Sequence, residues 1–162
     1  MDPNRSGREP IPPPIGPRGF FTGVEIRPIV AGVVSDYVAT IVFGFLYLLT
    51  YFPRELFENG GLSEEALDKA AREMMTSPDG LLSLAMIGAI CTALGGYIAA
   101  RMARGEKIKH GALVGFVSLV LGIIITAASG EGNPVPYWYE LLTYILPIPA
   151  GALGGFFAEK KW

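Results

Sequence analysis

The sequence predicts an all-α integral membrane protein, a four-helix bundle built from two tandem parallel helical hairpins. Its 162 residues are 51% hydrophobic and only 17% charged, whereas soluble domains carry about 25% charged residues. The long apolar runs, such as Val38–Leu49 and Val114–Thr126, lack the charged stripe of a soluble helix. Two of the apolar runs also end in the same motif, at Ala93–Arg101 and at Ala152–Lys160.

Four segments approach the length that a helix needs to cross a hydrocarbon core, roughly 20 residues. The predicted spans cover residues 29–52, 81–103, 110–128 and 137–158. With their loops they form a membrane domain, residues 28–162. A proline-rich tail, residues 1–27, precedes this domain and favours extended polyproline II structure. We expect the tail either to be solvated or to lie along a partner.

The loop at residues 53–80 is acidic and contains one predicted helix, from Ser63 to about Met75. Ser63 is the expected N-cap, and two glutamates follow it in the first turn. The apolar residues of this helix share one face: Leu67, Ala70, Ala71 and Met74. We expect this face either to rest on the membrane surface or to cover the bundle.

Ten of the thirteen basic residues lie on one side of the predicted spans. The positive-inside rule assigns that side to the cytoplasm, together with both termini and the loop at residues 102–109. We therefore expect a multi-pass protein of the cell membrane (plasma or inner), with the first span as an uncleaved anchor. The net charge of −2 argues against a nucleic-acid partner.

The repeated motif closes both even-numbered spans, so the two hairpins are predicted to point the same way through the membrane. A Gly-Gly-aromatic-x-Ala-x-basic ending is followed by a short basic loop and then by His110-Gly111-x-x-x-Gly115. This pattern resembles small four-helix bacterial membrane proteins of uncharacterised function. The resemblance rests on residues 95–115 and on the copy at residues 152–160. It implies the four-helix fold and carries over no activity.

Small residues recur at four-residue intervals along three of the spans. They are Gly88, Thr92, Gly96, Ala100, Gly111, Gly115, Ala150, Gly151, Gly154 and Gly155. Small residues let membrane helices approach closely, either inside the bundle or at an interface with another subunit. Because the chain has 21 glycines, more than four helices need, we expect some of them to face a partner or a second copy.

Asp36 is a carboxylate within the first span, roughly 11 Å from its cytoplasmic end at 1.5 Å per residue. Intramembrane carboxylates are costly and point to function. Ser118 is predicted to lie at the same depth on the third span. Asp36 is then either a hydrogen-bonded structural residue or part of an ion or proton site.

The fourth span is interrupted by Pro147 and Pro149. Neither proline can donate a backbone hydrogen bond, so the carbonyls of Thr143 and Ile145 are left free. Free carbonyls in a membrane need a donor, water or an ion. The break is either a simple kink or a second part of the Asp36 site.

The remaining candidates have simpler interpretations. Cys91 is a packing residue, and His110 packs at the membrane interface; axial ligation of a haem or pigment has no other support. Four basic residues are expected to contact anionic lipid headgroups: Arg101, Arg104, Lys107 and Lys109. No catalytic residue, metal site or cofactor is predicted.

The leading functional hypothesis is a non-enzymatic accessory or structural subunit that packs against other membrane proteins. Glycine-rich faces and the proline-rich tail motivate it. The alternative is a small ion or proton pathway that uses Asp36 and the helix break at Pro147 and Pro149.

Overall fold

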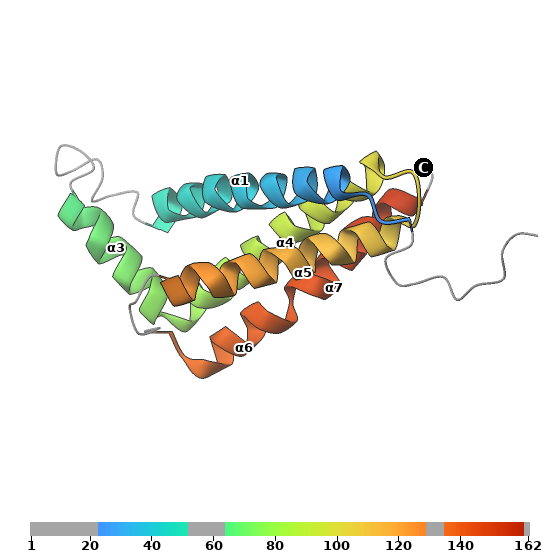
Figure 1. The fold of residues 1–162 in the computed structure, drawn as a ribbon. Coiled ribbons are helices and arrows are strands. Elements are labelled where there is room, and N and C mark those ends of the chain that lie inside the picture. The colour runs from blue at the N-terminus through green and yellow to red at the C-terminus, as the bar shows by residue number, and fades with distance from the viewer. Residues whose placement is uncertain (1–22, 52–63, 129–134, 161–162) are drawn as a thin grey trace, which may run out of the picture.

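The computed structural model describes residues 23–51, 64–128 and 135–160, and every regular element within these ranges is a helix (Figure 1). The helices are α1 (Ile26–Tyr51), α3 (Glu64–Thr76), α4 (Pro78–Met102), α5 (Lys107–Ala128), α6 (Tyr137–Ile145) and α7 (Pro147–Glu159). Most of the proline-rich tail and the predicted N-cap Ser63 lie outside the described residues. The tandem relationship between the two hairpins stays a prediction.

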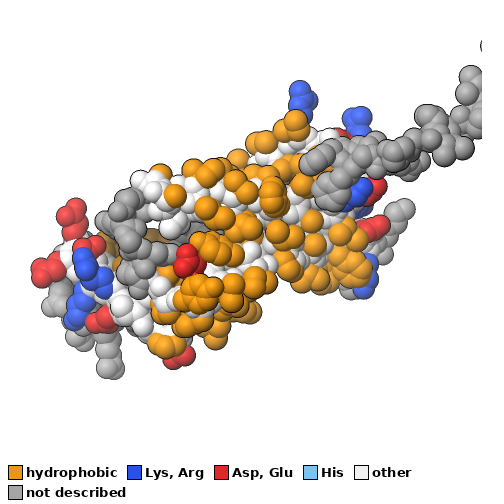
Figure 2. Space-filling model, turned by 60° about the horizontal axis from the view of Figure 1, so that its bottom comes forward, with side chains coloured by type: hydrophobic (Ala, Val, Ile, Leu, Met, Phe, Trp, Pro, Cys, Tyr) orange, Lys and Arg blue, Asp and Glu red, His pale blue; other side chains and the backbone are white. Residues whose placement is uncertain are grey.

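Four helical segments are long and apolar enough to cross a membrane: Ile26–Leu49, Pro78–Met102, Lys107–Ala128 and Tyr137–Glu159. The last combines α6 and α7. Apolar side chains cover the middle of the molecule and charged ones gather toward its two ends (Figure 2). Val30, Ile41 and Ile125 are 54%, 69% and 57% exposed, as expected of side chains that contact lipid. These features support a multi-pass membrane protein.

The two ends of the bundle differ in charge. At the basic end α1 begins, α4 ends, α5 begins and α7 ends, and its residues include Arg27, Arg101, Arg104, Lys107, Lys109 and Lys160. The opposite, acidic end carries α3, with Glu64, Glu65, Asp68 and Glu73, and Asp79 at the start of α4. The start of α1 and the end of α7 therefore both lie at the basic end.

Helix α3 lies at the acidic end, where part of its apolar face turns toward the bundle. Ala70 and Met74 are 4% and 7% exposed, and α3 packs against the start of α4. The Ser77 hydroxyl caps α4 by accepting a hydrogen bond from the Gly80 amide at 3.1 Å. Met74 lies so close to Gly80 that a side chain there would strike its carbonyl oxygen.

Helices α4 and α5 lie between α1 and α7 (Figure 1). The fourth span is broken at Leu146, as the two prolines predict. The Ala150 amide bonds to the Leu146 carbonyl at 3.0 Å and starts the ladder of α7. None of the nine residues of α6 is buried, whereas five residues of α7 are: Ala150, Gly151, Gly154, Gly155 and Ala158.

Burial is concentrated toward the basic end of the bundle. We call this region the closed half and define it by its buried residues. They are residues 28, 32, 33 and 36 in α1, residues 91, 92, 95, 96, 99 and 100 in α4, residues 110, 111, 114 and 115 in α5, and residues 150, 151, 154, 155 and 158 in α7. In the open half, toward the acidic end, the described residues of α1, α5 and α6 are all exposed or partly exposed. Asp36 and Thr92 lie at the boundary between the two halves.

Candidate intramembrane carboxylate site

The side chain of Asp36 lies on the inward face of α1 and is only 4% exposed. Close contact between α1 and α4 makes this burial possible. A Cβ atom at Gly95 would lie 2.9 Å from the Asp36 Cβ, and one at Gly32 would lie 2.6 Å from the Gly95 carbonyl oxygen. Glycine at both positions therefore lets the two helix backbones meet beside the carboxylate.

Hydroxyl groups from two other helices surround the Asp36 carboxylate. Ser118 Oγ in α5 donates to Oδ2 at 2.6 Å, and Thr92 Oγ1 in α4 lies 3.2 Å from both carboxylate oxygens. The Thr40 hydroxyl, one turn further along α1, also interacts with the carboxylate. Asp36 thus joins three helices through neutral hydrogen-bond donors.

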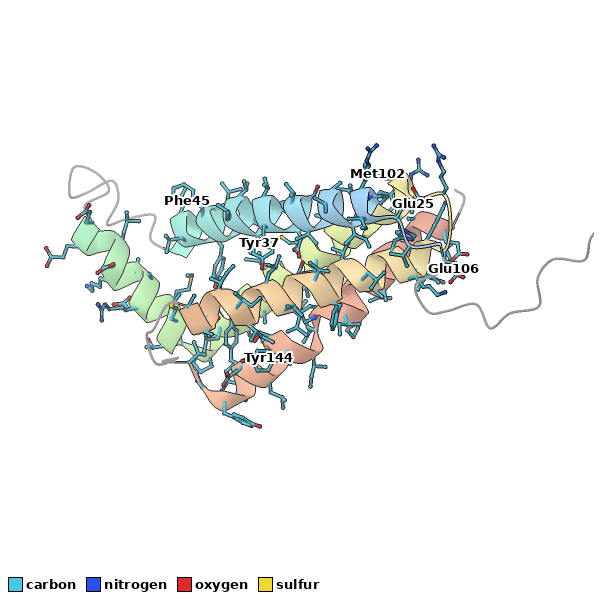
Figure 3. The ribbon with its side chains drawn as sticks, in the orientation of Figure 1. Glu25, Tyr37, Phe45, Met102, Glu106 and Tyr144 are labelled. Atoms are coloured by element: carbon cyan, nitrogen blue, oxygen red, sulfur yellow. The ribbon has the colours of Figure 1, made fainter. Side chains whose placement is uncertain are left out.

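Tyr37 adds a second link between α1 and α5. Its hydroxyl donates to the Ser118 carbonyl oxygen at 3.3 Å, and its side chain lies between the two helices (Figure 3). Ser118 is therefore held by α1 at both its side chain and its backbone. These contacts bring Ser118, which was predicted only to lie at the depth of Asp36, to the carboxylate itself.

Apolar packing closes the bundle between Asp36 and the basic end. Val33, Ala99 and Val114 form a buried cluster, and Ala99 and Val114 are fully inaccessible. Ile29 and Val117 pack against this cluster.

Thr143 and Ile145 were predicted to form part of the Asp36 site, but none of the described hydrogen bonds joins either residue to Asp36. The Thr143 hydroxyl donates to the Glu140 carbonyl within α6 at 2.8 Å, and Ile145 is 57% exposed. The break instead meets α5, because a Cβ atom at Gly115 would strike the Pro147 carbonyl. The fourth span packs on α4 and α5, on the far side of those helices from α1 (Figure 1).

Most of the predicted small-residue faces are used inside the bundle. A side chain at Gly111 or Gly96 would strike the Gly151 carbonyl, and one at Gly154 would strike the Ala93 carbonyl. Gly155 packs in the same way on Lys107, and Ala100 and Ala150 are buried. Gly88 differs, since a Cβ atom there would meet nothing within 4 Å.

His110 is more deeply placed than its position at the start of a span suggests. It is 0% exposed, with Nδ1 2.9 Å from the Glu106 carbonyl and Nε2 3.0 Å from the Glu25 amide. The carbonyl can only accept and the amide can only donate, so Nδ1 carries the proton and Nε2 accepts. Glu25 also accepts a hydrogen bond from the Arg104 amide at 3.1 Å through Oε1, which joins the start of α1 to the α4–α5 loop.

The four predicted headgroup-binding residues fall into two pairs. Lys107 Nζ donates to the Ala158 carbonyl at 3.2 Å, and Lys109 Nζ lies 2.6 Å from Glu106 Oε2. Arg101 and Arg104 have exposed side chains at the same end. The two arginines are therefore the better placed pair for contact with lipid phosphates.

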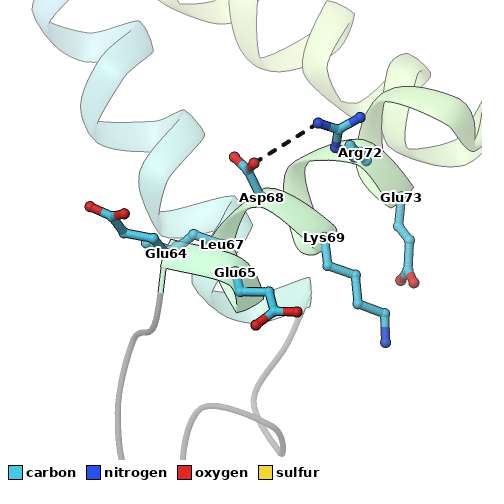
Figure 4. Close-up of a pocket in the computed structure, with 7 residues that line it drawn as sticks. All are labelled: Glu64, Glu65, Leu67, Asp68, Lys69, Arg72 and Glu73. Atoms are coloured by element: carbon cyan, nitrogen blue, oxygen red, sulfur yellow. Dashed lines mark ion pairs between the residues drawn. The ribbon is translucent and has the colours of Figure 1, made fainter.

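A charged hollow lies on the surface of α3 (Figure 4). Its lining consists of Glu64, Glu65, Leu67, Asp68, Lys69, Arg72 and Glu73. Arg72 Nη2 and Asp68 Oδ2 are 4.0 Å apart, with both side chains about four-fifths exposed. Exposed pairs of this kind contribute little to stability. Within the ranges that the structure describes, no group of three or more His, Cys, Asp or Glu residues is placed to hold a metal ion.

No protein-family model, curated protein or solved structure matches this chain. The resemblance to small bacterial four-helix membrane proteins therefore stays a prediction.

Proposed function

We propose that the chain is a non-enzymatic proton pathway in the membrane and that Asp36 is its proton-binding residue. The observation that carries the proposal is a buried carboxylate whose described partners are all hydroxyl groups. An ionised carboxylate is costly in this environment unless a cation or a proton compensates its charge. Reversible protonation satisfies this requirement without movement of the helices.

The hydroxyl partners suit a proton better than a metal ion. Thr92 and Ser118 already direct donors at both carboxylate oxygens, so a metal ion would have to displace them. A proton on Oδ1 requires only that the Thr92 hydroxyl rotate from donor to acceptor, since a hydroxyl can be either. The hydrogen that it turns away can bond to the carbonyl four residues earlier, at Gly88.

The test measures proton flux in proteoliposomes that contain a pH-sensitive dye, with the membrane potential clamped. Wild-type protein is expected to carry protons, and Asp36→Asn is expected to reduce the flux to that of empty liposomes. Glu140→Gln is the matched control, because Glu140 is a carboxylate of the fourth span that bonds within α6 to the Tyr144 hydroxyl at 2.7 Å. Wild-type protein without flux, or unchanged flux in Asp36→Asn, contradicts the proposal; sodium-dependent flux lost in Asp36→Asn replaces the proton with a metal cation.

Infrared difference spectroscopy gives a second readout. The carboxylic C=O stretch of protonated Asp36 should appear when the pH is lowered and should be absent from Asp36→Asn. A stretch that persists in the variant would assign the proton to another carboxyl group.

A role as accessory subunit is a second proposal, and α6 is the observation that favours it. All of its residues are exposed or partly exposed, and Tyr137 is 78% exposed. The partner would be another membrane protein or a second copy that covers α6. Extraction in mild detergent followed by native mass measurement tests this role, and a monomer without a bound protein contradicts it. The cytoplasmic location of both termini and the cell membrane as the host membrane are proposals that rest on the charge asymmetry.

A further inference from the structure

We infer that the structure shows the state in which Asp36 exchanges its proton with the acidic end of the bundle, and that release toward the basic end requires the closed half to open. The inference rests on the proposed function and adds a direction to it. It follows from an asymmetry around the carboxylate: the closed half lies on one side of Asp36 and open space lies on the other.

On the basic side, three successive barriers separate Asp36 from water. The first is the backbone contact between Gly32 and Gly95, where a Cβ atom at Gly95 would lie 2.5 Å from the Gly32 carbonyl oxygen. The second is the buried cluster of Val33, Ala99 and Val114. The third is the fully buried His110. Protons need water or hydrogen-bonding groups to move, and the first two barriers supply no side-chain donor or acceptor.

The third barrier does not act as a relay in this structure. Both ring nitrogens of His110 are engaged, one with the Glu106 carbonyl and one with the Glu25 amide. The charged groups nearby are also engaged at the basic end. Glu25 bonds to the Arg104 amide, Lys109 pairs with Glu106, and Lys107 bonds to the Ala158 carbonyl.

On the acidic side, the helical rows that contain Asp36, Thr92 and Ser118 continue into glycine. Gly44 follows Asp36 and Thr40 in α1, Gly88 lies one turn before Thr92 in α4, and Gly122 lies one turn after Ser118 in α5. A Cβ atom at any of these three glycines would meet nothing within 4 Å. In the closed half, by contrast, a Cβ atom would strike the backbone of another helix at each of four glycines: Gly32, Gly95, Gly111 and Gly115. The three open glycines leave room for water on the acidic side of Asp36.

Cysteine labelling in oriented proteoliposomes tests the direction of access. Cys91, the single native cysteine, is first replaced by alanine. Gly88→Cys and Gly122→Cys then report on the open side, and Val114→Cys reports on the closed side. The probe is a charged, membrane-impermeant methanethiosulfonate, which reacts with thiolates in water. Asp79→Cys and Lys160→Cys report which end of the protein the reagent reaches.

We expect Gly88→Cys and Gly122→Cys to react only when the reagent is added at the acidic end. Val114→Cys should stay unmodified from both sides. We assign Ile123, one residue beyond Gly122 and 44% exposed, to the lipid-facing side, so Ile123→Cys should also stay unmodified, because a thiol in lipid does not ionise. Reaction of Val114→Cys from the basic end overturns the inference. So does protection of both glycine positions while Asp79→Cys reacts.

The same labelling in an Asp36→Asn background separates this inference from the proposed function. If Asp36 carries no proton flux but the two glycine positions still react from the acidic end, the proposed function fails and the one-sided access stands. If the flux depends on Asp36 but labelling occurs from the basic end, the direction is wrong and the proton-binding role stands.

Discussion

Ser118 Oγ donates a 2.6 Å hydrogen bond to Asp36 Oδ2 and so joins two residues that are 82 positions apart in the chain. The bond links α1 to α5 at the level where burial ends. Toward the basic end the helices meet at glycines, and toward the acidic end they do not. The hydroxyl therefore fastens α1 at the edge of the packed region.

Ser118→Ala should destabilise the protein by about 1–3 kcal/mol, because the buried Asp36 carboxyl group loses one of its hydrogen-bond donors. The midpoint of thermal unfolding in detergent measures the change. Ser83→Ala, which lies toward the acidic end of α4, is the control and should leave the midpoint nearly unchanged. Equal midpoints for Ser118→Ala and wild type would show that the bond adds no stability.

Two glycines of α5 should respond in opposite directions to alanine. Gly111→Ala places a methyl group against the Gly151 carbonyl and the Gly155 backbone, and it should cost about 1–3 kcal/mol through overpacking. Gly122→Ala meets nothing within 4 Å and should be neutral or stabilising by up to about 1 kcal/mol, since alanine is the better helix former. The comparison uses unfolding midpoints in one detergent. Stabilisation by Gly111→Ala would contradict the close contact between α5 and α7.

His110→Leu should destabilise the basic end by about 1–3 kcal/mol, because the Glu25 amide loses its buried acceptor. Hydrogen exchange at Glu25 should accelerate in this variant. Glu25→Gln is the matched control, since it keeps the backbone amide and a side-chain oxygen that can accept from Arg104. Unchanged exchange in His110→Leu would mean that the ring nitrogen does not hold the amide.

Retention of anionic lipid should depend more on Arg101 and Arg104 than on Lys107 and Lys109. Each arginine replaced by glutamine should weaken retention by about 1 kcal/mol, or roughly fivefold. Lys107→Gln should instead lower stability, because Lys107 Nζ holds the last turn of α7 at Ala158. Native mass measurement of bound phosphatidylglycerol compares the variants. Equal loss from all four would contradict the division into pairs.

The positions of the four apolar helices along the chain could be read from the sequence, because each is a long apolar run. The helices begin about one turn earlier than the apolar runs, at Ile26, Pro78 and Lys107, since polar residues can extend a helix into the interface. Hydropathy also put Ser118 at the level of Asp36, and the structure shows that the two residues are in contact. The helix break was predicted separately, from two prolines that cannot donate backbone hydrogen bonds.

The order of the helices around the bundle could not be read in this way. Thr143 and Ile145 share a depth range with Asp36, but α4 and α5 separate their span from α1. Thr92 was assigned to a small-residue face, and its role as a partner of the carboxylate was missed. Its hydroxyl among glycines and alanines was the available signal. The burial of His110 was missed because its partners Glu25 and Glu106 lie in loops, where neither spacing nor hydropathy reports a contact.

Because the close contacts of α1 lie in the closed half of the bundle, the rest of this helix can tilt as a rigid rod about the point where it is held. The hydrogen bonds of Asp36 and Tyr37 to Ser118 hold α1 at the edge of the packed region, and the helix continues from Tyr37 to Tyr51, roughly 21 Å at 1.5 Å per residue. A tilt of about 5° at this point would move the far end of the helix by roughly 2 Å. A change too small to disturb the glycine contacts can therefore widen or narrow the acidic end of the bundle.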